Sequence, residues 1–239
     1  MNKKIFSTII LSLKGYSLLR IYQIHACKAI ELKAKSIEFG AYKEKNKNFS
    51  NHFKGNSDFL YSNFYKNNDK NYFKIDLTKK LKIKKNKINN VIIMNVIEHL
   101  PNFSLTFKEI NRILKTNGNI IGSTPFIYPV HGAPNDYYRF TKDFFNMTLK
   151  KNKFKKIKID ALGFGPFIAS YNLIYAYIKF FPLFKELILI LSYILDFIIQ
   201  LFVKTKLKEI YPIGFYFTAK KWKFITGLLF LQILQQLKQ

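Results

Sequence analysis

The sequence predicts an α/β fold: a mainly parallel, seven-stranded sheet with helices on both faces, plus an apolar helical insert before the last strand. Three observations carry this prediction. Residues 90–94 form a continuous, mostly β-branched run, which is typical of a strand buried on both faces of a parallel sheet. Strand-like and helix-like stretches alternate along the chain. Residues 181–203 are strongly apolar and follow the last such alternation.

Each element follows from a local pattern. The first 34 residues are expected to be helical, because Ile9, Leu13 and Ile24 recur at helical spacing. Pro101 opens a helix that ends near residues 117–118, and Thr141 caps a further helix through residue 149. Six more strands are expected at residues 36–39, 58–61, 71–75, 119–124, 154–161 and 213–219.

These elements divide the chain into five segments. In order they are an N-terminal helical segment (1–34), an α/β core (35–164), an apolar helical insert (165–208), the last strand of the core (209–222) and a C-terminal amphipathic tail (223–239). Ligands of parallel α/β sheets bind beyond the carboxyl ends of the strands. The segments that follow each strand are therefore the first place to look for a site.

Composition excludes several classes of protein. The 239 residues are 49% hydrophobic, so the chain is not mainly disordered. One cysteine, Cys27, rules out an internal disulfide framework and a cysteine-based zinc site. The four histidines show no metal-ligand spacing, so no metal site is expected.

The charge is strongly basic but poor in arginine. Forty Lys and Arg against fourteen Asp and Glu give +26, yet only Arg20, Arg112 and Arg139 are arginines. Lysine accompanies Asn, Ile, Phe and Tyr, the residues of AT-rich codons, so compositional drift is one origin of the charge. An anionic membrane surface and nucleic acid are the other two. Nucleic acid is disfavoured, because the lysines are scattered and no aromatic-basic module is present.

The apolar segment 181–203 leaves three interpretations open. It is long enough to span a bilayer, but Lys185, Glu186 and Asp196 would each cost about 2.5–3.5 kcal/mol near its centre. It could lie in a membrane interface instead, or pack against the sheet, a dimer partner or the substrate site. The return of residues 211–220 as a strand argues against a span. The N-terminal lysines and apolar run lack a cleavage site, so we expect a cytoplasmic protein, with peripheral contact on the inner face of the membrane as an option.

Two stretches carry a family resemblance. Residues 95–126 contain NVIEHLPN, KEINRILKTNGNII and TPF, which resemble class I S-adenosylmethionine-dependent methyltransferases with a (D/N)xLEH element after the fourth strand. Residues 131–141, HGAPNDYYRFT, resemble a subgroup with an HxxPxDYYRFT element. The likeness covers about residues 30–160 and 211–220. It implies a Rossmann-like methyltransferase fold and S-adenosylmethionine as cofactor.

The resemblance also implies cofactor-binding residues. Glu38 and Gly40 would hold the methionine end of the cofactor, and Asn95 would face its methionyl part. A glycine there lets the backbone approach a ligand closely. The loop departs from the family's (D/E)xGxGxG pattern, because Tyr42 stands at the second glycine.

Two acids and a leucine would contact the nucleoside. Asp58 is the acid nearest to the second strand and would accept from the ribose hydroxyls, or else it is a solvated loop acid. Asp76 resembles the family acid that accepts from the adenine amino group, with the backbone of Leu77 beside the ring. The alternative for Asp76 is the cap of a short turn.

The loop after the fifth strand holds the densest polar cluster. His131 is expected to be the catalytic base, and Asp136 to fix its tautomer. An acceptor would meet four further side chains, with the alternatives that Asp136 and Arg139 pair to pin the loop and that His99 caps its own turn. The expected substrate-binding residues are His99, Tyr137, Tyr138 and Arg139.

The leading hypothesis is therefore an enzyme that transfers the methyl group of S-adenosylmethionine, with oxygen preferred, to a small-molecule, sugar or lipid-linked acceptor. The acceptor class rests on analogy. The alternative is a catalytically degenerate protein of the same fold that binds a membrane or a partner, as suggested by Tyr42.

Overall fold

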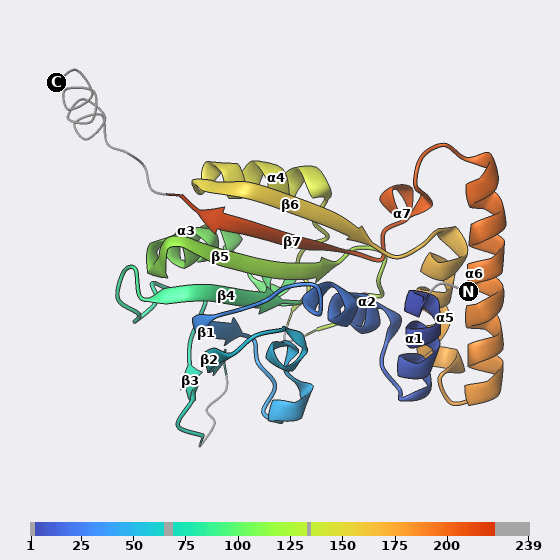
Figure 1. Cartoon of the computed structure of the whole chain (residues 1–239), viewed down its shortest axis with the longest axis horizontal. Helices are drawn as coiled ribbons and strands as arrows, with labels where there is room; N and C mark the ends of the chain where they lie inside the picture. Colours follow the sequence, from blue (N-terminus) through green and yellow to red (C-terminus); the bar gives the residue numbers. More distant parts are fainter. Residues whose placement is uncertain (1–2, 65–68, 133–134, 223–239) are drawn as a thin grey trace.

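A seven-stranded sheet organises the residues that the computed structural model describes, which are 3–64, 69–132 and 135–222. The strand order is β3-β2-β1-β4-β5-β7-β6, in which only β7 runs antiparallel to its neighbours (Figure 1). The expected α/β class is confirmed. The strands are β1 (Ala34–Phe39), β2 (Ser57–Asn63), β3 (Tyr72–Lys74), β4 (Ile88–Met94), β5 (Leu114–Pro125), β6 (Phe154–Leu162) and β7 (Gly214–Lys221).

Helices cover both faces of this sheet. Alternate residues of β4 face opposite ways, so Val91 and Ile93 join one core cluster while Ile92 and Met94 join the other. The helices α3 (Phe103–Ile113) and α4 (Lys142–Lys151) pack on the first cluster. The second cluster is covered by α2 (Leu18–Cys27), α5 (Pro166–Ile178) and α6 (Pro182–Phe202).

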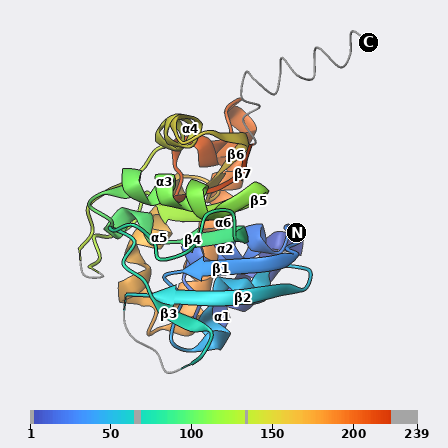
Figure 2. The same cartoon turned by 90° about the vertical axis from the view of Figure 1, so that its left-hand side faces the viewer.

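The remaining elements are short or peripheral. The helix α1 (Lys3–Leu13) packs against α2 and α6, and α7 (Leu207–Ile210) precedes β7. Three 3₁₀ turns lie in loops: η1 (Lys45–Lys47), η2 (Phe49–His52) and η3 (Ile97–His99). In Figure 1, α1, α5 and α6 gather at the end of the sheet toward which β5 and β6 point, and Figure 2 views the sheet from the opposite end.

Some expected boundaries were wrong. The N-terminal segment is two helices rather than one, because Gly15 takes a φ of 84° and turns the chain between them. The helix from Pro101 ends at Ile113, and β5 begins at once at Leu114 rather than at residue 119. The predicted amphipathic tail, 223–239, lies outside the described residues.

The helix α6 carries its charges inward. Lys185, Glu186 and Asp196 are all buried, although they belong to a mainly apolar helix. The Lys185 Nζ donates to the Ser12 carbonyl at 2.8 Å and pairs with Glu186 at 2.9 Å. Both carboxylate oxygens of Asp196 accept from the first amides of α5, those of Phe167 and Ile168. The polar side of α6 thus anchors it to α1 and α5.

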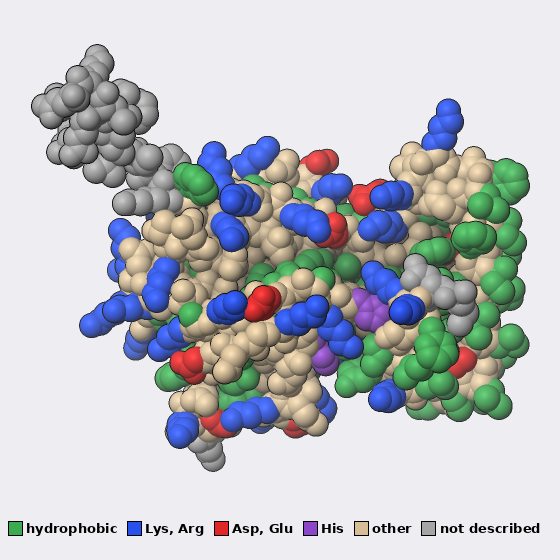
Figure 3. Space-filling model, viewed as in Figure 1, with side chains coloured by type: hydrophobic (Ala, Val, Ile, Leu, Met, Phe, Trp, Pro, Cys, Tyr) green, Lys and Arg blue, Asp and Glu red, His purple; other side chains and the backbone are tan. Residues whose placement is uncertain are grey.

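The outer face of α6 is consequently apolar and exposed. Leu183, Leu201 and Phe202 expose 86%, 67% and 85% of their surface. Figure 3 shows hydrophobic side chains gathered along this side of the molecule, with lysines and arginines spread over the rest. None of the helices in the described ranges is both long and apolar enough to cross a membrane.

Candidate functional site

Glu38 ends β1 and holds the loop that follows it. Its buried carboxylate accepts from the backbone amides of Phe49 and Ser50 at 2.9 and 2.8 Å, at the start of η2. Burial raises the pKa of this carboxyl, and the two amide hydrogen bonds partly oppose that shift. Glu38 therefore shapes the cofactor loop instead of presenting a free carboxylate at its surface.

Gly40 occupies a position that only glycine fits. Its φ is 70°, and a Cβ there would collide with the Val96 side chain. The turn after β1 consequently lies tight against the turn after β4. The two loops meet at the carboxyl edge of the sheet, the edge formed by the segments that follow β1 to β5.

Tyr42, which replaces the family's second glycine, reorganises the loop. Its amide donates to the Asn48 Oδ1 at 2.7 Å, and its carbonyl accepts from the Tyr72 hydroxyl at 2.7 Å. The Arg20 guanidinium lies over its ring, 5.2 Å from the centroid. Between β1 and β2 the chain forms η1 and η2, so short 3₁₀ turns stand in this loop.

The two nucleoside acids differ in their placement. Asp58 was expected after the second strand, but β2 begins at Ser57, so Asp58 is its second residue and lies at the amino edge. The register was misjudged because β2 runs on to Asn63, whose Nδ2 donates to the Ala41 carbonyl at 2.7 Å. Asn63 therefore stands where the acid was expected, and Asp58 is withdrawn as a cofactor residue.

Asp76 follows β3 at the carboxyl edge and is half-exposed. Its Oδ1 accepts from the amide and the hydroxyl of Thr78 at 2.9 and 2.6 Å, and these bonds lower the pKa of the carboxyl. The neighbouring Leu77 is buried, with its carbonyl accepting from the Thr106 hydroxyl at 3.0 Å. Asp76 thus caps its own turn and remains charged at the edge.

Asn95 follows β4 with a φ of 54° and pairs with a residue of α2. Its Oδ1 accepts from the Gln23 Nε2 at 2.5 Å, and its Nδ2 donates to the Gln23 Oε1 at 3.1 Å. Gln23 is fully buried and donates also to the Ser123 hydroxyl at 2.9 Å. Our sequence analysis missed Gln23; its only signal was a glutamine among the apolar residues of that helix.

His131 and Asp136 lie together, in the loop after β5. The Asp136 Oδ2 accepts from the His131 backbone amide at 2.9 Å and lies 3.2 Å from Nδ1 of the His131 ring. Arg139 donates to both oxygens of Asp136, at 2.5 and 2.6 Å. These bonds hold the pKa of Asp136 far below its usual range. Both interpretations made from the sequence are present: Asp136 orients the histidine and also pins the loop through Arg139.

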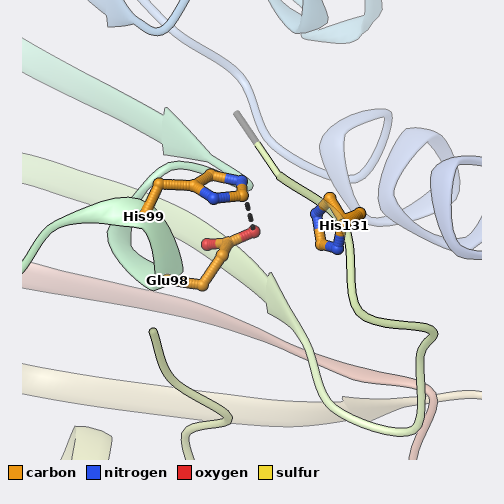
Figure 4. Close-up of side chains that lie close together, drawn as sticks. All are labelled: Glu98, His99 and His131. Carbon is orange, nitrogen blue, oxygen red and sulfur yellow. Dashed lines mark ion pairs between the residues drawn. The ribbon is translucent and has the colours of Figure 1, made fainter. Parts of the chain in front are cut away.

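Glu98 and His99 face this loop from η3. Glu98 is completely buried, and neither of its carboxylate oxygens has a hydrogen-bond partner among the described residues. Burial raises its pKa to about 8, with a further contribution from Asp136. The His99 Nε2 is 3.9 Å from the Glu98 Oε1, and its Nδ1 donates to the Asn135 carbonyl at 2.6 Å. Figure 4 shows His131 beside this pair.

The two tyrosines occupy the outer part of the loop. The Tyr137 amide donates to the Glu98 carbonyl at 2.9 Å, while its ring is 46% exposed. The Tyr138 hydroxyl donates to the Pro101 carbonyl at 3.2 Å, and its ring packs edge-on against Phe103 at 5.4 Å. Tyr137 is therefore the one of the two that leaves its ring open to an incoming molecule.

A polar pocket of about 370 Å³ lies at the opposite, amino edge of the sheet. It is lined by Glu31, Lys33, Asn89, Asn90 and residues 116–119, so no predicted site residue reaches it. We place the site at the carboxyl edge, because that is where the polar side chains converge and where ligands of parallel sheets bind.

Known proteins agree with this placement. A family model described as a methyltransferase domain matches residues 60–122. The structure is similar to phosphoethanolamine N-methyltransferase 2 of Haemonchus contortus in complex with S-adenosyl-L-methionine, with a TM-score of 0.55 and 14% identity over 84% of this chain and 52% of that chain. The chain has the class I methyltransferase fold. It spans about half the length of this Haemonchus contortus protein.

Two further methyltransferase structures match along most of their length. One is a SAM-dependent methyltransferase of Archaeoglobus fulgidus, with a TM-score of 0.52 and 14% identity over 89% of this chain and 94% of that chain. The other is a Haloferax volcanii methyltransferase in complex with the Trm112 activator, with a TM-score of 0.56 and 10% identity over 86% and 90%. No curated protein sequence matches this chain.

The class I methyltransferase predicted from the sequence is thereby confirmed in domain and fold. The same findings support the expectations of an enzyme and of S-adenosylmethionine as its cofactor. The carboxyl edge of this methyltransferase fold fits that cofactor in its chemistry. The charged Asp76 and the left-handed turns at Gly40 and Asn95 provide an acceptor and close backbone approach on the same edge.

Proposed function

We propose that this protein transfers the methyl group of S-adenosylmethionine to an oxygen of a small-molecule, sugar or lipid-linked acceptor. The observation that carries this proposal is the His131–Asp136–Arg139 cluster, which lies at the carboxyl edge of a methyltransferase fold. A hydroxyl acceptor must lose a proton during transfer, and this cluster contains a suitable base.

Cofactor binding is assigned to the turns that follow β1 to β4. Gly40 and Asn95 would admit the methionine end between two tight turns, while Asn63 replaces the withdrawn Asp58 near the ribose. Asp76, with the backbone of Leu77, would receive the adenine. When bound there, S-adenosylmethionine supplies an electrophilic methyl group on a positively charged sulfur.

The proton is assigned to His131. Its Nδ1 faces only oxygen acceptors, the Asp136 carboxylate and the Pro129 carbonyl, so Nδ1 carries the hydrogen and Nε2 has the lone pair. That nitrogen would take the proton of the acceptor hydroxyl as the oxygen–methyl bond forms. His99, Tyr137, Tyr138 and Arg139 border the same space, and we assign acceptor contact to His99 and Tyr137.

The outer face of α6 points to a lipid-linked acceptor at an anionic membrane. Its exposed apolar side chains form a continuous strip, and the exposed Lys179, Lys204 and Lys206 flank the two ends of the helix. Apolar residues bounded by lysines are the composition of helices that lie in the headgroup region. Because α5 contacts the loop after β5 through Asn172 and Ile127, a membrane at α6 would lie next to the acceptor side of the site.

Calorimetric titration with S-adenosylhomocysteine tests the cofactor assignment. We expect micromolar binding that Asp76→Asn weakens by about tenfold, since this variant keeps an oxygen for the Thr78 hydrogen bonds but loses the charge. Asp58→Asn is the matched control: it alters an aspartate at the amino edge and should leave the affinity unchanged. Equal losses in both variants, or no binding by the unmodified protein, would contradict the proposal.

A second titration addresses the alternative of a catalytically degenerate protein, which the comparisons do not favour. His131→Ala should retain the affinity for S-adenosylhomocysteine while abolishing methyl transfer in a screen of hydroxyl acceptors. Loss of cofactor affinity in this variant would assign His131 a structural role instead.

A further inference from the structure

Three groups that carry lone pairs converge between η3 and the loop after β5. One carboxylate oxygen of Glu98 and one ring nitrogen each of His99 and His131 lie within 4.8 Å of one another. The two histidine rings are 5.0 Å apart and nearly perpendicular. Figure 4 shows the three side chains reaching this space from two separate segments.

The hydrogen bonds around the two rings orient their lone pairs. The His99 Nδ1 faces the Asn135 carbonyl at 2.6 Å, so it must donate, and its Nε2 is left as an acceptor 3.9 Å from Glu98. The His131 Nδ1 likewise faces only the Pro129 carbonyl and Asp136, at 3.2 Å each. Both imidazoles are thus held in the tautomer whose Nε2 can bind a cation.

Glu98 adds an unpaired carboxylate to these nitrogens. It is completely buried, yet both of its oxygens lack a donor among the described residues. Burying a carboxylate without a partner is costly, so such a group ordinarily binds a proton or a metal ion. Arg139 is committed to Asp136 through two hydrogen bonds and does not serve Glu98 as a donor.

We propose that Glu98, His99 and His131 bind a divalent transition-metal ion. Two histidines and one carboxylate are a ligand set that zinc and non-haem iron use, and it leaves coordination positions open. Ligand atoms around such an ion lie roughly 3.3 Å apart, so the 3.9 Å between Glu98 and His99 would close by about 0.5 Å. The Asn135 carbonyl and Asp136 act as the outer partners that orient metal-binding histidines.

This inference deepens the proposed function and rests on it for the role of the ion. The acceptor hydroxyl would occupy an open position on the metal, which lowers its pKa, and its proton would leave to water. The resulting oxygen attacks the methyl carbon; an oxygen–carbon bond forms, the carbon–sulfur bond breaks, and neutral S-adenosylhomocysteine leaves. His131 then serves as a ligand, and the metal takes over the activation that the base would otherwise provide.

The test is zinc binding by the untagged full-length protein after chelator treatment and dialysis. Calorimetry with Zn²⁺ alone should give one equivalent bound, and Co²⁺ should give visible bands of a nitrogen- and oxygen-bound ion. Glu98→Gln and His131→Ala should each weaken zinc binding at least about tenfold, whereas His52→Ala, which alters a histidine outside the cluster, should not. His131 is on a half-exposed loop, so its variant tests the site even if Glu98→Gln fails to fold.

Two outcomes overturn the inference. One is no zinc binding by the unmodified protein at tenfold excess metal. The other is zinc affinity that the cluster variants leave equal to that of His52→Ala, as expected for an adventitious ion on the surface. Titrating the same metal-free samples with S-adenosylhomocysteine separates the two proposals. Cofactor binding without zinc binding refutes the metal site alone, while zinc binding without cofactor binding refutes the methyltransferase assignment.

Discussion

Asp136 holds His131 at two points, because one carboxylate oxygen accepts from the backbone amide and also lies 3.2 Å from the ring Nδ1. The backbone contact fixes where the loop places the histidine, and the ring contact fixes its tautomer. Asp136 is itself buried and paired with Arg139, so three residues of one loop form a rigid unit before any ligand arrives. The same unit serves His131 as a base or as a metal ligand.

Asp136→Asn should release the tautomer of His131. The variant keeps the shape of the side chain but loses the charge that favours a hydrogen on Nδ1, so nitrogen NMR shifts should change from one tautomer to a mixture. We also expect the free energy of unfolding to fall by about 1–3 kcal/mol, because the charge-assisted bonds to Arg139 weaken. Asp160→Asn, at an exposed position, is the control. A single unchanged tautomer in Asp136→Asn would show that Pro129 alone sets it.

Asp196→Ala should destabilise the protein through α5. The Asp196 carboxylate accepts from the amides of Phe167 and Ile168, so its removal leaves two donors unpaired at the start of that helix. Denaturant titration should give a loss of about 1–3 kcal/mol, the range for a lost cap or an unsatisfied buried group. Asp160→Ala removes an aspartate from a surface pair and should cost under about 1 kcal/mol. Equal effects would mean that α5 does not depend on this cap.

His25 should make stability fall as the pH decreases. Burial, assisted by Lys4 and Lys28, lowers its pKa from 6.5 to about 4, so below pH 6.5 the unfolded state binds a proton that the folded state resists. Stability contributed by the neutral ring is therefore complete above about pH 6.5 and is lost toward pH 4. Because the ring is half-exposed, we expect only about 1 kcal/mol between pH 7 and pH 5.

Thermal melts of His25→Gln should show a shallower decline across this window. Lys28→Gln, which leaves the ring buried, should keep most of the decline, since burial is the largest cause of the shift. An identical pH profile for His25→Gln and the unmodified protein would count against this assignment.

The exposed face of α6 predicts binding to anionic vesicles. Replacing Leu187 and Leu191, which are 62% and 51% exposed, by glutamine should lower flotation with phosphatidylglycerol vesicles several-fold, and 0.5 M salt should lower it for every variant. The matched control is Phe73→Gln on β3, because Phe73 is 45% exposed but lies far from this helix in the sheet order. Vesicle binding that the two leucine substitutions leave intact would exclude α6 as the contact.

Local pattern was sufficient to predict the sheet and its loops. The β-branched run at residues 90–94 can be accommodated only as a doubly buried strand, and the polar segments that follow each strand necessarily share one edge when the strands are parallel. The motif from Asn95 to His99 and the loop from His131 to Thr141 were therefore assigned to the correct end of the sheet.

Pairing across the chain required the tertiary structure. The position of Asp58 depended on where β2 begins, which sequence alone defines poorly because a strand boundary has no side-chain signal of its own. Gln23 and Asn95 pair between α2 and β4, and Glu98, His99 and His131 come together from two loops without any characteristic spacing. The sequence likewise predicted an apolar helix at 181–203 but not its orientation. Only packing against α1 and α5 buried its three charges and turned its leucines outward, because a buried charge needs partners that no single helix can supply.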